Sequence, residues 1–245
     1  IKKFPFQFGF RKFHNKLSRS LIDSFDFDQF DLIIDNQTRL KNTLIYKKIP
    51  HKHYISPCMR YLFSKPFYFK KKRKNIISRL TDYLNTITNK NLKPNYNIQI
   101  PKSYSDQAEK LILKDKKYIG FSLTAGHLTR IKELSLKEII KLCNHYSEKY
   151  TPTFFIEDKY KDLKLEIKNN VKDSFFPEEF VENNFKKPMM VTALGSLTEF
   201  NITIDNGISH MLSFSNNKNY IFFNKSSEKF LPQNKKSIGF DCEKE

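Results

Sequence analysis

Tryptophan is absent from this sequence, and cysteine and glycine are scarce. The three cysteines, Cys58, Cys143 and Cys242, are too few and too widely spaced for a disulfide framework or a zinc site. Their number is typical of a reducing compartment. Six glycines in 245 residues form neither a P-loop nor a glycine-rich dinucleotide fingerprint. No run approaches the roughly 20 apolar residues of a membrane span, which excludes a polytopic membrane protein.

Acidic residues are also in short supply. Lysine and arginine number 44 against 26 aspartates and glutamates, so the formal net charge is +18. Nucleic acid, an anionic membrane surface or a phosphorylated small molecule would each suit such a charge. An AT-rich genome would also favour the many Lys, Asn, Ile and Phe residues without any selection for binding. The charge alone therefore leaves the partner open.

The densest basic run follows an aromatic segment, residues 66–69, and consists of Lys70, Lys71, Lys72, Arg73 and Lys74. Basic residues beside aromatic ones suit a membrane interface or single-stranded nucleic acid. A solvated loop would have the same composition, so the run by itself does not decide between these readings.

Short apolar runs alternate with amphipathic segments along the chain. We predict strands at 30–35, 53–56, 117–123, 153–156, 201–205 and 220–224, and helices at 38–48, 74–89, 136–150, 158–171, 191–199 and 207–214. Ser135 and Glu138 would form a capping box at the third of these helices. The alternation predicts an α/β fold with parallel sheets. The polar, proline-containing segment 91–102 is the predicted linker, which gives domains 1–100 and 101–245.

Two segments combine strand ends with residues that could bind an anion. In the first, Asp205, Asn206, Gly207, Ser209 and His210 follow a predicted strand and open a helix, whose free N–H groups and dipole favour an anion. Asp205 could instead simply cap that helix, and His210 could be a core histidine.

In the second segment a predicted strand ends in the turn Thr124, Ala125 and Gly126, with Lys132 shortly after it. The turn could present backbone amides to a phosphate, and Lys132 could add a point charge. His51 and His53 would share a strand face, but no nearby cysteine or acid completes a metal site, so no metal is predicted.

Taken together, three blocks resemble glycosyltransferase family 9, the heptosyltransferases of lipopolysaccharide assembly. Residues 30–39 are similar to the family's Tyr-Asp-(apolar)3-Asp-x-Gln strand, and residues 118–135 to the block that opens its donor domain. Residues 194–223 are similar to the family's signature around Asp-(Ser/Thr)-Gly-x-x-His, which here begins at Asp205 and ends at His210. The resemblance spans residues 28 to 232.

The resemblance implies a GT-B fold, with two Rossmann-like domains that face a cleft. It implies inverting, metal-independent transfer of a sugar, such as heptose from ADP-heptose, to a lipid-linked saccharide of the lipopolysaccharide core. Asp205 would orient the donor, and the turn at Thr124, Lys132 and the segment Asn206–His210 would hold its diphosphate. The run Lys70–Lys74 would lie on the acceptor side, against the anionic inner membrane of a bacterium, which places the protein in the cytoplasm at that membrane.

The sequence departs from the family pattern in several places. Asn206 stands where the family has Ser or Thr, and Leu134-Ser135 where it has Trp-Pro after the lysine. The family's first strand and its Gly-Asp loop, which carries the catalytic base, have no match. We therefore expect a fragment without its N-terminal unit or a diverged, catalytically inactive relative as alternatives to an active enzyme. A basic nucleic-acid-binding protein is a further alternative, although no recognition motif supports it.

Overall fold

The computed structural model describes residues 28–36, 39–67, 75–124, 135–224 and 226–242, and the fold is reported for these residues. They divide into two compact units, one made of residues 28–67 and 82–92 and the other of residues 75–81 and 93–242. The helix at 76–88 contributes residues to both units.

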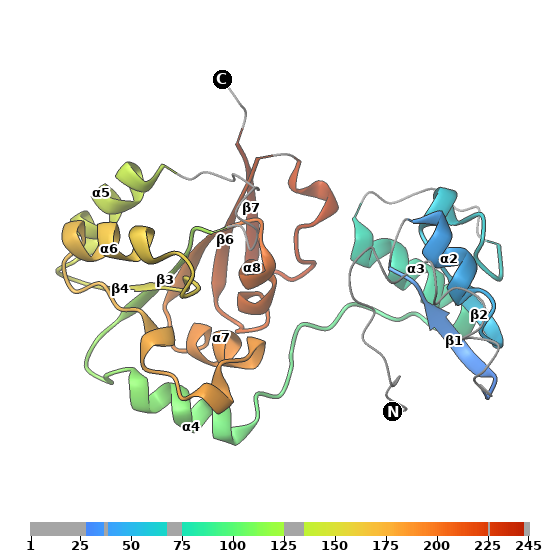
Figure 1. The fold of residues 1–245 in the computed structure, drawn as a ribbon, viewed down its shortest axis with the longest axis horizontal. Coiled ribbons are helices and arrows are strands. Elements are labelled where there is room, and N and C mark those ends of the chain that lie inside the picture. Colours follow the sequence, from blue (N-terminus) through green and yellow to red (C-terminus); the bar gives the residue numbers. More distant parts are fainter. Residues whose placement is uncertain (1–27, 37–38, 68–74, 125–134, 225, 243–245) are drawn as a thin grey trace. The chain divides into compact units, whose positions relative to one another are not determined.

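The first unit is built on two parallel strands. β1 (Phe30–Ile34) leads through α2 (Leu40–Tyr46) to β2 (His51–Ile55), and Leu32 pairs with His53 while Ile34 pairs with Ile55. A 3-10 turn, η1 (Cys58–Tyr61), and α3 (Ile76–Thr88) follow. The predicted elements are all present, each within a few residues of its predicted ends (Figure 1).

A buried carboxylate holds this first unit together at the end of β1. Asp35 is 4% exposed, and its Oδ2 accepts hydrogen bonds from Thr43 Oγ1 at 2.8 Å, Tyr54 OH at 3.2 Å and Ser56 Oγ at 3.2 Å. These three donors compensate the cost of removing the charge from water. Burial, together with the charge of Asp35, raises the pKa of the Tyr54 phenol.

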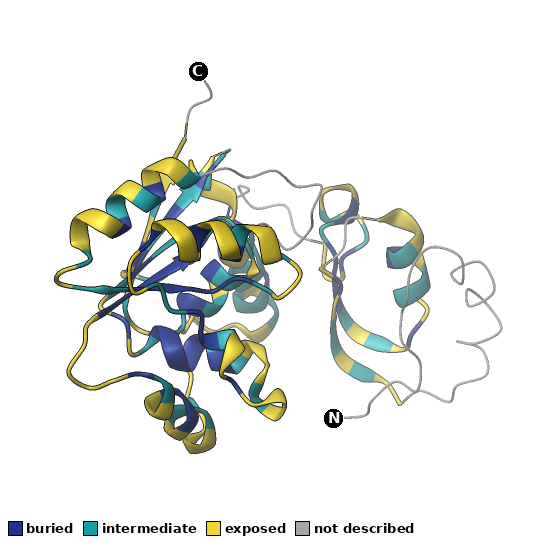
Figure 2. Ribbon diagram, turned by 60° about the vertical axis from the view of Figure 1, so that its left-hand side comes forward, coloured by how far each residue is buried: buried dark blue, intermediate teal, exposed yellow. Residues whose placement is uncertain are grey.

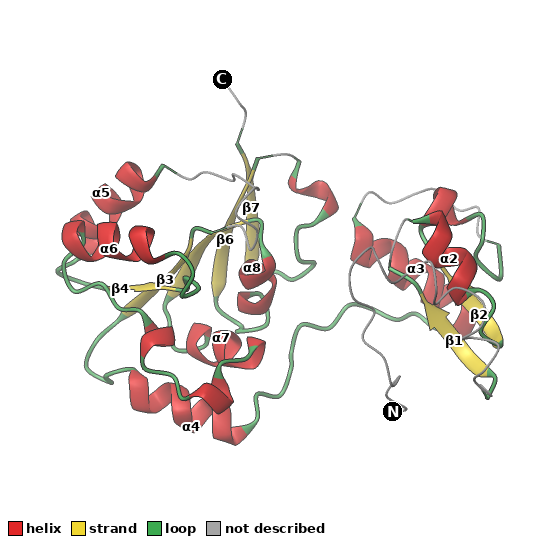
Figure 3. Cartoon of the chain, in the orientation of Figure 1, coloured by secondary structure: helices red, strands yellow, loops and turns green. Residues whose placement is uncertain are grey.

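The second unit is a five-stranded parallel sheet in the order β4-β3-β5-β6-β7. Its strands are β3 (Tyr118–Ser122), β4 (Thr151–Phe154), β5 (Phe200–Ile204), β6 (Lys218–Phe223) and β7 (Ser237–Asp241). Its helices are α4 (Lys102–Leu111), α5 (Leu136–Tyr146), α6 (Lys161–Asn170), α7 (Pro188–Gly195) and α8 (Gly207–Leu212), with short 3-10 turns η2 (Pro177–Glu179), η3 (Asn183–Phe185) and η4 (Ser227–Lys229). The α/β class with parallel sheets is confirmed (Figure 3).

Helices cover the sheet in two layers. One core cluster joins α5 and α6 to the sheet through residues such as Ile139, Phe154 and Ile167, and the other joins α4, α7 and α8 to it through Ala108, Leu194 and others. Burial is accordingly concentrated in the strands and on the inner sides of the helices (Figure 2). A parallel sheet is usually covered in this way because the side chains on both of its faces are buried.

Four details differ from the sequence prediction. The structure adds α4, directly after the predicted linker, and the edge strand β7. The helix predicted at 191–199 begins earlier, at Pro188, a residue that suits the first helical position. The predicted capping box at α5 is wrong: Ser135 makes no side-chain cap hydrogen bond, and its backbone oxygen instead accepts from the amide of Glu138 at 3.0 Å.

Candidate functional site

The two segments predicted to bind an anion emerge at the same edge of the second unit's sheet. β3 and β5 are parallel neighbours, and Ser122 at the end of β3 pairs with Thr203 near the end of β5. The chain therefore leaves β3 at Thr124 and leaves β5 at Asp205 side by side. Ligands of open parallel sheets bind at this carboxyl edge.

Asn206 joins these two segments directly. Its Oδ1 accepts from the backbone amide of Ser209 at 2.8 Å, which makes it the N-cap of α8. Its Nδ2 donates to Ser122 Oγ at 2.9 Å and to the Thr124 carbonyl oxygen at 2.8 Å. Ser209 completes a capping box, is 1% exposed, and donates through its hydroxyl to the Asn206 carbonyl oxygen at 2.8 Å. The structure thus brings Thr124, Asn206 and Ser209 together.

Gly207 and His210 are exposed, while Asp205 is half-buried, as is Asn206 itself. Because Asn206 is the N-cap, the alternative in which Asp205 merely caps α8 is wrong. The backbone amide of Asp205 donates to Phe222 O at 3.0 Å, which leaves its half-buried side chain at the sheet edge. His210 is exposed, so it is not a core histidine. Gly207 has a negative φ, and a Cβ added there would meet no atom within 4 Å.

The remaining predicted site residues lie outside the described residues. They are Ala125, Gly126 and Lys132 on the donor side, and Lys70, Lys71, Lys72, Arg73 and Lys74 on the acceptor side. Their roles stay predictions from the sequence.

Sequence reasoning missed a cluster of charges that follows β4 at the same carboxyl edge. Asp158 forms ion pairs with Lys164 at 2.8 Å and Lys186 at 3.5 Å, and the hydrogen bond from Lys164 holds the pKa of Asp158 below its usual value. Lys164 is 5% exposed, while burial raises the pKa of Glu178 nearby. Glu157 and Asp158 directly follow the strand predicted at 153–156, and this pair of acidic residues is the signal that could have found the cluster.

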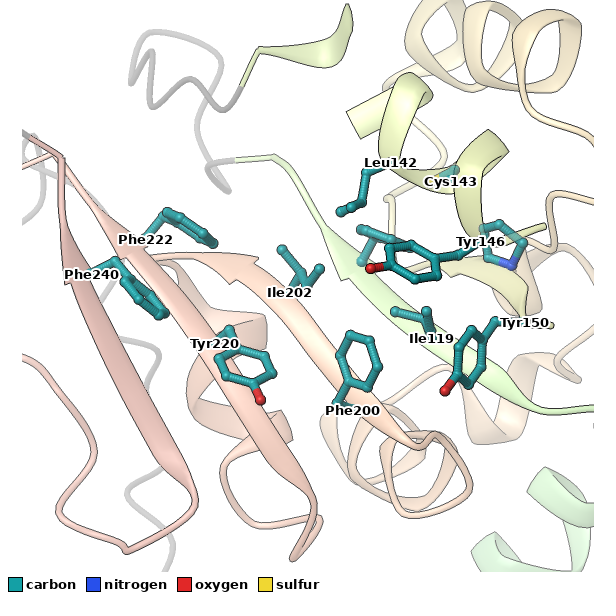
Figure 4. Close-up of a pocket in the computed structure, with 12 residues that line it drawn as sticks. Ile119, Leu142, Cys143, Tyr146, Tyr150, Phe200, Ile202, Tyr220, Phe222 and Phe240 are labelled. Carbon is teal, nitrogen blue, oxygen red and sulfur yellow. The ribbon is translucent and has the colours of Figure 1, made fainter. Parts of the chain in front are cut away.

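An apolar pocket lies elsewhere in the second unit, on the sheet face that carries α5. It has a volume of about 450 Å³, and aromatic side chains of β5, β6 and β7 line it together with Cys143 and Tyr146 of α5 (Figure 4). Burial raises the pKa of the Cys143 thiol to about 12. Of the predicted donor-binding residues that the structure describes, none lines this pocket.

Within the described part of the chain, no group of three or more His, Cys, Asp or Glu side chains could hold a metal ion. Over the same residues, no helix has the length and apolar character needed to cross a membrane.

The sequence matches no family model, and no curated protein matches it either. Solved structures do match. The glycosyl transferase family 9 structure from Veillonella parvula superposes with a TM-score of 0.69 at 13% identity, over 94% of this chain and 66% of that one. Escherichia coli heptosyltransferase WaaC with ADP-2-deoxy-2-fluoro heptose gives a TM-score of 0.64 at 12% identity, over 92% of this chain and 70% of that one.

Escherichia coli ADP-heptose lps heptosyltransferase II gives a TM-score of 0.61 at 17% identity, over 93% of this chain and 72% of that one. The chain has the fold of glycosyltransferase family 9. The family resemblance and GT-B fold predicted from the three sequence blocks are therefore confirmed. The chain spans about two thirds of the length of the Veillonella structure.

Proposed function

We propose that this protein is a glycosyltransferase that takes its sugar from a nucleoside diphosphate. The observation that carries the proposal is the direct hydrogen-bonded junction of Thr124 and Asn206, which unites two independently predicted anion-binding segments at the carboxyl edge of a parallel sheet. The fold supports it, because the structural neighbours are glycosyltransferases and two of them were solved with ADP or an ADP-sugar analogue.

The proposed donor is a nucleotide sugar, with ADP-heptose as the first candidate. Asp205 would accept hydrogen bonds from donor hydroxyls, since a carboxylate aimed at the diphosphate would repel it. The first amides of α8, beside Asn206 and Gly207, would face the diphosphate together with His210, while Ser209 supports the cap from beneath. On the sequence prediction, Ala125, Gly126 and Lys132 complete the phosphate site from the other segment.

Sugar transfer requires stabilisation of the departing diphosphate and a base for the acceptor hydroxyl. In the proposed inverting mechanism, Lys132 and the backbone amides would neutralise the diphosphate as the bond to the sugar breaks, so that no metal is required. The acceptor oxygen would attack from the opposite side of the sugar and lose its proton to a base. We assign that base to no residue of this chain.

A calorimetric titration with ADP, UDP, GDP and CDP tests the donor site. We expect saturable binding of one nucleotide, with ADP the first candidate, and about 10-fold to 100-fold weaker binding in Lys132→Ala, because a charge-assisted phosphate contact is lost. Short single-stranded DNA serves as the competing ligand class. Binding of DNA alone, abolished by moderate salt, would contradict the proposal and favour a nucleic-acid-binding protein.

The proposed acceptor is a lipid-linked saccharide of the lipopolysaccharide-core type, reached at an anionic membrane surface. The run Lys70–Lys74 would supply the attraction, at about 1 kcal/mol per basic residue near the surface. Replacing these five residues with glutamine should abolish flotation with anionic vesicles and leave nucleotide affinity unchanged. Equal, weak binding of the unaltered protein to neutral and anionic vesicles would contradict the membrane role.

A further inference from the structure

Asn206 uses its whole side-chain amide to join three pieces of the chain. Its oxygen caps α8 through Ser209, and its two N–H groups bond Ser122 and Thr124, residues 84 and 82 positions away. The partners are buried: Ser122 is 0% exposed, Thr124 7% and Ser209 1%. Water therefore has little access to replace these hydrogen bonds.

Only an amide side chain serves all three partners from this position. Serine or threonine caps a helix about as well as asparagine, but its hydroxyl has a single hydrogen to donate. Aspartate would also cap the helix, yet its carboxylate would face the Thr124 carbonyl oxygen with no hydrogen to offer. The cap alone does not require asparagine, whereas the link to the end of β3 does.

We infer that Asn206 is a positioning residue that fixes the end of β3 against the start of α8 and so sets where Thr124 lies relative to the first amides of that helix. The expected effect on donor binding rests on the proposed function, whereas the hydrogen-bonded link from Asn206 to Ser122 and Thr124 is a property of the fold. If the amide donors are removed, Ser122 Oγ and the Thr124 carbonyl oxygen lose a buried partner, and the end of β3 must shift to regain one. Small displacements of groups that hold a reacting substrate are costly in rate and affinity.

Asn206→Ser is the variant that separates the link from the cap. It keeps a good N-cap, so α8 should still form, but the two buried acceptors left without a donor should lower the thermal midpoint. Affinity for ADP should fall about tenfold in calorimetry, and backbone amides at the end of β3 should exchange hydrogen faster. In a double variant with Ser122→Ala, the two losses of ADP affinity should not add fully, because both changes remove the same hydrogen bond.

Asn75→Ser is the matched control. Asn75 also caps a helix, accepting from Ile77 and Ser78 amides at 3.0 and 3.1 Å, while its Nδ2 donates to Leu231 O at 3.0 Å. It lies outside the proposed donor residues, so Asn75→Ser should leave both ADP affinity and exchange at β3 unchanged.

The affinity and exchange measurements decide the inference together. Unchanged ADP affinity in Asn206→Ser, or an equal loss in Asn75→Ser, would overturn it. If the unaltered protein binds no nucleotide, the proposed function is wrong, and the exchange measurement alone decides the link. Faster exchange at the end of β3 in Asn206→Ser, and not in Asn75→Ser, would then support it, whereas identical exchange would overturn it.

Discussion

Asp205→Asn should lower the rate of sugar transfer by roughly 100-fold, because hydrogen bonds from donor hydroxyls to a carboxylate are charge-assisted and the amide replaces them poorly. Stability should change much less than the rate does. The structure separates the two effects, since the cap of α8 belongs to Asn206 and Asp205 is held by its backbone amide on Phe222 O. The assay is release of the nucleoside diphosphate from the sugar nucleotide that binds.

Asp241→Asn provides the control for this experiment. Asp241 also ends a strand of the same sheet, and its Oδ1 accepts from the amide of Ser227 at 2.7 Å. Its replacement should leave turnover intact. Full turnover in Asp205→Asn would remove Asp205 from the donor site, and an equal loss in both variants would point to a general effect of charge.

Gly120→Ala should lower the free energy of unfolding by about 3 kcal/mol, a typical cost of overpacking a core. A Cβ at Gly120 would lie 2.0 Å from Asn201 Oδ1 and 3.0 Å from a ring carbon of Phe155. Asn201 is 0% exposed and its Oδ1 accepts from Thr198 Oγ1 at 3.1 Å, so it cannot simply turn aside. Urea denaturation followed by far-UV circular dichroism measures the change.

Gly207→Ala is the matched control for Gly120→Ala. The added methyl at Gly207 meets no atom within 4 Å, and stability should change by less than about 0.5 kcal/mol. Equal urea midpoints for Gly120→Ala and Gly207→Ala would show that the centre of the sheet accommodates the methyl group added at Gly120. A loss of ADP affinity in Gly207→Ala without loss of stability would agree with close approach of the donor to this backbone.

Every described strand except β7 was predictable, because each is a short, mainly apolar run between polar segments. The apolar runs at 30–35, 117–123 and 201–205 became β1, β3 and β5. α4 was missed because most of its residues are polar, and its one buried apolar residue is Ala108, a weak apolar signal. β7 was missed because it is a five-residue edge strand, half exposed, with a glycine at its centre.

The candidate site was predictable as two separate segments but not as one junction. The pattern Asp205–His210 marked a strand end, a glycine and a helix start, which local sequence can encode. The bonds from Asn206 to Ser122 and Thr124 cross more than 80 residues, and no local pattern specifies such a pairing. Ser135 illustrates the opposite error, since a local capping pattern was present and the side chain did not use it.

The aromatic pocket beside α5 affects how this protein can be assayed. Phe240 and Tyr146 at its margin are each 42% exposed, so folded molecules offer an apolar surface to environment-sensitive dyes. Dye fluorescence would then be high before unfolding and would respond to any compound that displaces the dye. Intrinsic tryptophan fluorescence cannot replace the dye, because the chain contains no tryptophan. Label-free calorimetry and circular dichroism are therefore the methods of choice for ligand screening with this protein.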